Sequence, residues 1–293
     1  MTTPRLMGAA VKRKEDPRLL TGRATYVEDL TLAGLHHVAF VRSPHAHARI
    51  RAIDTTRAAR RPGVLRVVTG QEIRALCKPL PLGGSGPEGG GGEGGGGERA
   101  GGTARKHYPL AVERVRHVGE AVAAVVATTA ALAADAAQEV RVDWEPLPAV
   151  ADPFAAMADG APRLHADAPR NVEHETTIRA GDPDGAFARA RRVVRQRMVS
   201  QRLCGVPLEG RAALAAPDPA TGGVVLWATN QAPHGLRNDL AAVLGVPQTA
   251  VRVIAPEVGG GFGVKFNCYP EDATLAALAR QLGVPLRWAE TRA

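Results

Sequence analysis

The sequence predicts an α+β fold, because short strand patterns and helix patterns follow one another along most of the chain. Three stretches carry this prediction. Residues 251–280 read as a strand, a glycine-rich loop and a helix. The apolar run at 121–127 is typical of a buried strand. Residues 211–215 and 224–228 read as two strands joined by the turn at 218–222.

The helix that follows the glycine-rich loop has clear boundaries. Pro270 suits the first helical position, and Glu271 and Asp272 favour the positive end of the helix dipole. Gly283 is a suitable residue just beyond the last turn. An apolar stripe lies between these ends, formed by Leu275, Leu278 and Leu282.

Length and composition favour a globular chain of about two domains. The 293 residues are 45% hydrophobic, which is enough to build sizeable cores. A net charge of +8 raises the question of nucleic-acid binding. The arginine cluster at 189–197 has no interleaved aromatic residues, so a solvated basic face is favoured over a nucleic-acid site.

Cysteine usage and the apolar runs indicate a cytoplasmic protein. Cys77, Cys204 and Cys268 are far apart and match no metal or disulfide pattern, so we expect reduced thiols. No apolar signal-peptide core is found near the N-terminus. The longest apolar stretch, at 121–137, is too short to cross a bilayer, and no transmembrane segment is expected.

An N-terminal extension at 1–19 precedes a mixed α+β unit at 20–150, whose helices we expect on one side. Asp54 is predicted to cap one helix, and Thr128 or Thr129 another. Strands 37–41 and 48–53 are predicted to pair with each other. A glycine-rich insert at 83–102 is expected to be flexible, because it has too few side chains to pack. The other predicted elements are helix 55–60, strand 64–69, a helix from Gly70, helix 130–140 and strand 140–144.

A proline-containing linker is predicted at 151–175, and a second unit follows at 176–293. We expect this unit to begin with a helix from Asp182 to Ala190 and a long strand at 193–203. After the β pair, a helix at 234–244 is predicted to end at Gly245.

His45 and His47 form a His-x-His pair between the first two strands. Two imidazoles do not complete a metal site, and no further ligands stand near them in the sequence. We therefore assign no metal ligand in this chain.

The glycine-rich loop at 259–265, GGGFGVK, is the most distinctive local feature. Glycines allow backbone N–H groups to turn inward, and successive N–H groups of this kind form an anion-binding concavity. The loop is not a P-loop, because Phe266 stands after Lys265 where Ser or Thr is required. It also lacks the third glycine of the dinucleotide-binding fingerprint. A plain surface turn and an anion-binding loop both remain open on this pattern alone.

Six motifs occur in an order and spacing that are more specific than any one of them. They are DPRLLTG (16–22), YVEDL (26–30), RSPHAHARI (42–50), PLEGR (207–211), TNQAPH (229–234) and GGGFGVK (259–265). Together they resemble the molybdenum-cofactor-binding large subunit of the xanthine dehydrogenase/aldehyde oxidase family, of the aerobic carbon monoxide dehydrogenase type. The resemblance covers the chain from about Leu6 to Arg292, apart from the glycine-rich insert.

The resemblance implies a fold and a set of site residues. An α/β hammerhead domain is expected over residues 20–150, followed at 176–293 by the first part of a molybdopterin-binding α+β domain. By resemblance, the side chain of Gln231 hydrogen-bonds an oxo ligand of molybdenum, as an uncharged amide donor can. Phe262 and Gly263 are expected to pack beside the metal and to offer backbone N–H groups. Gly260 and Gly261 complete the cofactor-binding set.

The activity implied by the resemblance is that of a molybdenum hydroxylase. Such enzymes oxidise an aldehyde, an N-heteroaromatic compound or carbon monoxide with oxygen derived from water. The implied cofactor is molybdopterin with molybdenum, molybdopterin cytosine dinucleotide being the expected form, and copper is an open alternative. A small iron–sulfur subunit with [2Fe-2S] clusters and a medium FAD subunit are expected to carry the electrons, since the chain lacks a four-cysteine cluster motif.

By the resemblance, the general-base glutamate of the family lies in the C-terminal half of the large subunit, so this chain is expected to be an N-terminal fragment or one half of a split subunit with that C-terminal half as its partner. No catalytic residue is therefore assigned here, and the chain alone is expected to be inactive. The alternative is a non-catalytic fragment that only docks partner subunits. Phe266 replaces the carboxylate that follows the loop lysine in purine- and aldehyde-oxidising relatives of the xanthine dehydrogenase kind, so purine chemistry is not expected. Glu209 is interpreted as a buried charge paired with Arg211 or Arg202.

Overall fold

A seven-stranded mixed sheet is the centre of the computed structural model, which describes residues 7–81, 107–172, 175, 177–178 and 180–292. Its edge strands are β3 and β9, and the neighbours β1–β10 and β8–β9 are parallel while the other pairs are antiparallel. In spatial order the strands are β3 (Val64–Thr69), β5 (Ala121–Ala127), β1 (His36–Arg42), β10 (Leu286–Ala289), β7 (Ala212–Asp218), β8 (Gly223–Ala228) and β9 (Val251–Ile254).

Strand β5 is buried along its whole length, which its unbroken run of alanine and valine predicts. Ala123 and Val125 pack in one core with helices α2 (Thr56–Ala59) and α4 (Ala130–Gln138). Ala124 and Val126 lie in the main core, which includes residues of α3 (Gly70–Leu76), α7 (Pro233–Leu244) and α8 (Pro270–Leu282). The prediction that helices cover one side of this unit is therefore wrong, because side chains of a strand alternate between two faces and both are covered here.

A second, three-stranded sheet has the order β4–β2–β6. Its strands are Arg114–Val115, Ala48–Asp54 and Arg141–Pro146. Strand β2 pairs with β4 and β6, whereas β1 pairs with β5 and β10. The predicted pairing of 37–41 with 48–53 is wrong: the turn motif between the two strands carries the chain from one sheet to the other.

Most predicted boundaries in the second unit are confirmed. Helices α7 and α8 begin at Pro233 and Pro270, and each ends at a glycine in the left-handed region, Gly245 (φ 65°) and Gly283 (φ 71°). Only glycine adopts this conformation at little cost, which is why the sequence locates both ends so well. In the first unit Thr129 caps α4, as predicted. Thr55 occupies the N-cap position of α2, but the capping side chain is that of Asp54, whose Oδ1 accepts the Thr56 N–H at 2.9 Å.

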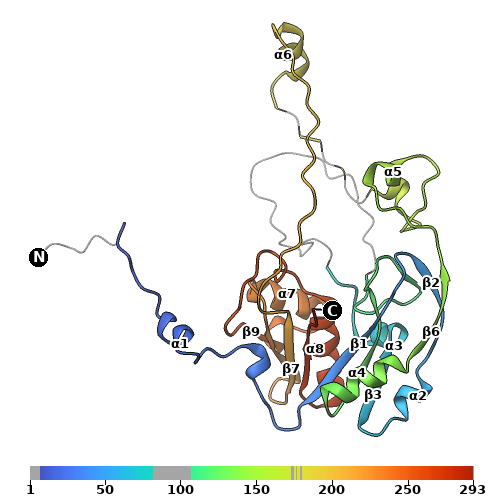
Figure 1. Ribbon diagram of the computed structural model, residues 1–293, viewed down its shortest axis with the longest axis vertical. Helices are drawn as coiled ribbons and strands as arrows, with labels where there is room; N and C mark the ends of the chain where they lie inside the picture. Colours follow the sequence, from blue (N-terminus) through green and yellow to red (C-terminus); the bar gives the residue numbers. More distant parts are fainter. Residues whose placement is uncertain (1–6, 82–106, 173–174, 176, 179, 293) are drawn as a thin grey trace, which may run out of the picture.

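The predicted strand at 193–203 is wrong, because those residues belong to no strand or helix. They run extended between α6 (Pro183–Arg189), which Figure 1 shows at one end of the molecule, and the sheet. The predicted linker contains short helical turns, α5 (Pro153–Met157) and η2 (Pro169–Asn171). Ahead of the sheet lie α1 (Asp16–Leu20) and η1 (Val27–Asp29), and the glycine-rich insert at 83–102 falls outside the described residues.

Across the described part of the chain, no helix combines the length and the apolar character needed to cross a membrane.

Candidate functional site

The loop after β9 has an unusual backbone. Gly260, Phe262 and Gly263 have positive φ angles of 98°, 51° and 85°. A side-chain-bearing residue such as Phe262 rarely adopts this region, so its backbone conformation costs roughly 1–3 kcal/mol that the surrounding contacts must offset. The Phe262 ring is 74% exposed and is therefore not held there by core packing.

The side chain of Gln231 lies directly against this loop. Its Oε1 accepts a hydrogen bond of 3.1 Å from the Gly263 N–H, and its own backbone N–H donates to the Lys265 carbonyl at 2.9 Å. A Cβ at Gly261 would lie 2.5 Å from Gln231 Oε1, so only glycine leaves room for the carboxamide. Sequence positions 231 and 261–265, far apart in the chain, thus form one structural unit.

The hydrogen bond from Gly263 fixes the orientation of the carboxamide of Gln231. Because Oε1 must face that N–H donor, Nε2 points to the other side. Nε2 has no hydrogen-bond partner among the residues that the structure describes, and Gln231 is exposed. The amide group therefore presents free donors to solvent.

Further free donors come from the loop backbone. The N–H groups of Gly260, Gly261 and Phe262 meet no acceptor within the described ranges, whereas the Gly263 N–H is engaged by Gln231. Of the expected pair, Phe262 therefore keeps a free N–H while that of Gly263 is engaged, and Gly260 and Gly261 provide two further free donors. Amide N–H groups and a carboxamide NH2 offer donors without a net charge, which suits oxo and phosphate oxygens.

A buried ion pair holds the two ends of the loop together. Lys265 is fully buried, and its Nζ lies 2.9 Å from Glu209 Oε2. The same oxygen accepts the Gly259 N–H at 2.6 Å, and the Glu209 N–H donates to the Gly259 carbonyl at 3.3 Å. One carboxylate oxygen therefore fixes both residue 259 and residue 265 of the loop.

The expected partners of Glu209, Arg211 and Arg202, are wrong. Arg202 is exposed, and Arg211 binds Glu290 at 2.8 Å and Glu271 at 3.2 Å. The expectation missed Lys265 because Glu209 and Lys265 are 56 residues apart, and local spacing shows only neighbouring cations. The only feature of the sequence that singled out Lys265 is that lysine is scarce in a chain rich in arginine.

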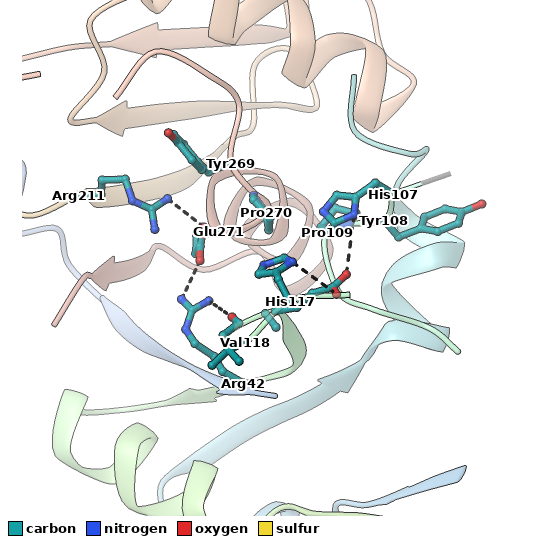
Figure 2. A pocket seen from close by; sticks show the side chains of 13 residues that line it. Arg42, His107, Tyr108, Pro109, His117, Val118, Arg211, Tyr269, Pro270 and Glu271 are labelled. Carbon is teal, nitrogen blue, oxygen red and sulfur yellow. Dashed lines mark hydrogen bonds and ion pairs between the residues drawn. The ribbon is translucent and has the colours of Figure 1, made fainter. Parts of the chain in front are cut away.

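Arg211 belongs to a second network, which Figure 2 shows beside a cavity of about 270 Å³. Glu271 links Arg211 to Arg42, whose guanidinium lies 2.7 Å from Glu271. Burial lowers the pKa of Arg211, but the carboxylates of Glu271 and Glu290 outweigh it, so its pKa is raised. The cavity walls do not include Gln231 or the glycine-rich loop, so this cavity is separate from the candidate site.

The histidine pair has structural contacts. His47 is buried with Nδ1 2.9 Å from the Pro148 carbonyl, and the His45 ring meets Trp144 edge-on at 5.6 Å. Within the described ranges, no three His, Cys, Asp or Glu side chains gather in a way that could hold a metal ion.

The fold and the loop define a class of protein in which a candidate anion site, made of uncharged N–H donors, lies beside a two-sheet α+β framework. Such a site fits the oxo groups and phosphates of a molybdopterin cofactor: the donors are free, and the space left by Gly261 accommodates the carboxamide.

Comparisons with known proteins agree with this class. The family model described as "Molybdopterin cofactor-binding domain" matches residues 164–293. The model described as "Aldehyde oxidase and xanthine dehydrogenase, a/b hammerhead domain" matches residues 21–81 and 92–148. The chain belongs to the xanthine dehydrogenase/aldehyde oxidase family.

Individual relatives match nearly the whole chain. The 6-hydroxypseudooxynicotine dehydrogenase complex subunit gamma of Paenarthrobacter nicotinovorans is 40% identical, over 98% of this chain and 34% of its own length. The carbon monoxide dehydrogenase large chain of Afipia carboxidovorans is 37% identical, over 98% of this chain and 35% of its own length. The crystal structure of quinoline 2-oxidoreductase from Pseudomonas putida 86 gives a TM-score of 0.83 at 37% identity. The match covers 97% of this chain and 34% of that protein's chain. The chain thus spans about a third of the length of the relatives it matches.

Proposed function

We propose that this chain is part of the large subunit of a molybdenum hydroxylase and holds one side of its molybdopterin cofactor. The supporting observation is the Gln231 carboxamide, which is locked by the Gly263 N–H and leaves its NH2 group free beside the free N–H groups of 260–262. When bound, the cofactor would supply a metal centre that takes up electrons as water-derived oxygen enters the substrate.

The residues of this chain would act by binding and orientation. Gln231 Nε2 would donate to an oxo oxygen without adding a charge, and the loop N–H groups would fix the position of the anionic group. The exposed Phe262 ring would cover one side of the site and exclude water. Because Glu209 and Lys265 lock the loop ends, these donors are positioned before the cofactor arrives.

The substrate proposed is an aldehyde, an N-heteroaromatic compound or carbon monoxide. The similar proteins are named for carbon monoxide, for 6-hydroxypseudooxynicotine, for quinoline and for aldehyde, which supports this range of substrates and does not select one of them. Molybdopterin cytosine dinucleotide remains the proposed form of the cofactor. A copper ion beside molybdenum is included for the carbon monoxide case, because one solved structure similar to this chain is that of a Cu,Mo-CO dehydrogenase.

The partners proposed are a small [2Fe-2S] subunit, a medium FAD subunit and the part of a large subunit that this chain does not span. The names "complex subunit gamma" and "large chain" of the relatives support such an assembly. The general base is proposed to come from the part not spanned, and the assembly is proposed to work in the cytoplasm.

Replacing Gln231 tests this function. In the assembled complex, Gln231→Ala removes the free donor from an exposed position, so we expect turnover to fall by about 10²-fold with the folding free energy changed by less than about 1 kcal/mol. Turnover is measured with a dye acceptor, and bound molybdenum by mass spectrometry. Gln71→Ala, at an exposed position of α3, is the matched control.

Two results separate the proposal from its alternatives. Unchanged turnover in Gln231→Ala would remove Gln231 from the site. A complex that retains no molybdenum with the unaltered chain would instead support a subunit that only docks its partners.

A further inference from the structure

An extended tract at residues 191–206 is exposed although its sequence suits a strand. The tract leaves α6 and runs outside the sheets to the start of the Pro207–Arg211 segment, as Figure 1 shows. Its large apolar side chains are mostly in solvent, with exposures of 79% for Val194, 82% for Met198 and 82% for Leu203. Exposed apolar runs of this kind mark surfaces that are covered by a partner.

The backbone of the tract is also unpaired. From residue 191 to residue 206, no backbone N–H or carbonyl bonds the backbone of another described residue. A row of free N–H and carbonyl groups in extended conformation is the template onto which another strand adds. The tract has the composition of a strand but lacks the backbone hydrogen bonds of one. A strand from another polypeptide that pairs with the tract explains both observations.

The charge of the tract restricts its partner. Arginines are frequent and acidic residues are absent from 191 to 206; the arginines are Arg191, Arg192, Arg195, Arg197 and Arg202. Two copies of such a tract repel each other, so pairing with a second copy is disfavoured. A strand that carries carboxylates next to apolar residues complements it.

The tract is connected to the candidate site. Its end at Gly205 is so close to the glycine-rich loop that a Cβ there would lie 3.0 Å from Val264 Cγ1 and 3.3 Å from Phe262 Cβ. Just beyond it, Arg292 donates to the Pro207 carbonyl at 2.7 Å and to the Leu208 carbonyl. A strand laid along the tract would therefore end beside Phe262.

The comparisons restrict the identity of the partner. Residues 191–206 fall inside the part matched as a molybdopterin cofactor-binding domain, and the relatives have about two thirds of their length outside the match. We infer that the tract pairs, strand to strand, with an acidic and apolar segment of the large-subunit polypeptide that this chain does not span. The inference rests on the proposed function for the identity of the partner, and on the unpaired tract for the mode of binding.

Proline substitutions test the backbone pairing. Successive N–H groups of a strand point to opposite edges, so of Ser200→Pro and Gln201→Pro at least one removes a hydrogen-bond donor from the pairing edge. Neither residue is charged, and neither backbone N–H donates to a residue that the structure describes, so the stability of the chain alone should not change. Ala10→Pro, at an exposed position whose own N–H bonds no described residue, is the control.

The probe is the part of the Paenarthrobacter nicotinovorans gamma subunit that this chain does not match, co-expressed with the full 293-residue chain. We expect a stable complex, protection of the 191–206 amides from hydrogen exchange, and an affinity at least tenfold lower for one or both proline variants. The control should stay within twofold of the unaltered chain.

Three results would overturn the inference: no complex with the unaltered chain, equal affinity for all variants, or self-association of the chain that the proline variants abolish. Measuring the molybdenum content of the same complex tests the proposed function independently of the strand pairing. A complex that forms through the tract but contains no molybdenum contradicts the proposed function and leaves the pairing intact.

Discussion

At the scale of single residues, the fully buried Lys265 ammonium has one ion-pair partner among the described residues, the Glu209 carboxylate 2.9 Å away. Removing one member of a buried pair leaves the other charge without compensation. We predict that Lys265→Met lowers the free energy of unfolding by about 3 kcal/mol, measured by urea denaturation.

The double variant Glu209→Gln with Lys265→Met separates the pair from the packing around it. Since it removes both charges, its loss of stability should be clearly smaller than the sum of the two single losses. Strict additivity of the two substitutions would show that the pair does not hold the loop.

At the scale of elements, the ends of α7 and α8 could be predicted because proline and glycine act locally. Pro270 requires only its own φ angle, and Gly283 needs only a left-handed turn. The buried strand β5 could also be predicted from the sequence, since its seven residues are apolar without interruption.

Other elements could not be predicted, because their partners are remote in the chain. The strand β10 is only four residues long, yet it lies between β1 and β7 at the centre of the large sheet. The tract at 193–203 has strand composition, but a strand forms only where another strand accepts its hydrogen bonds. In the site, the motifs indicated Gln231 and the loop, whereas the Glu209–Lys265 pair needed the three-dimensional fold.

Helix α8 carries a pH-dependent cap. Asp272 Oδ2 accepts the Tyr269 N–H at 3.1 Å, and burial, with a smaller effect of Glu271, raises the pKa of Asp272 to about 7. In the unfolded chain an aspartate has a pKa of about 3.9. Between these values the folded state holds a proton that the unfolded state has released, so this group's contribution to stability falls as pH rises from about 4 to about 7.

We predict that Asp272→Asn, which keeps an oxygen acceptor, removes this contribution. The stability of the unaltered chain relative to the variant should decrease by up to about 4 kcal/mol between pH 4 and pH 8, measured by denaturation at each pH. A difference that is constant over this range would contradict the raised pKa.

At the scale of the whole molecule, one sheet joins the two sequence units. Strand β1 of the first unit pairs in parallel with β10 of the second, and the Phe40 ring meets the Trp288 ring edge-on at 5.8 Å. The ion pair between Arg42 and Glu271 crosses the same boundary. The largest core contains Val68 from the first unit and Leu275 from the second, so it is shared, although the first unit also has a smaller core of its own around Ala123.

We therefore predict that the two units unfold in one cooperative transition, and tryptophan fluorescence can test it. Trp144 lies in the small sheet and Trp227 in β8, so each reports on one unit. One variant retains only Trp144 and the other retains only Trp227. Both carry Trp288→Phe, so any effect of that substitution on stability is common to the two. Their urea midpoints, each checked by far-ultraviolet circular dichroism, should agree within roughly 0.2 M. Two clearly separated midpoints, with Trp144 reporting first, would show that the β1–β10 pairing connects the units without coupling their stability.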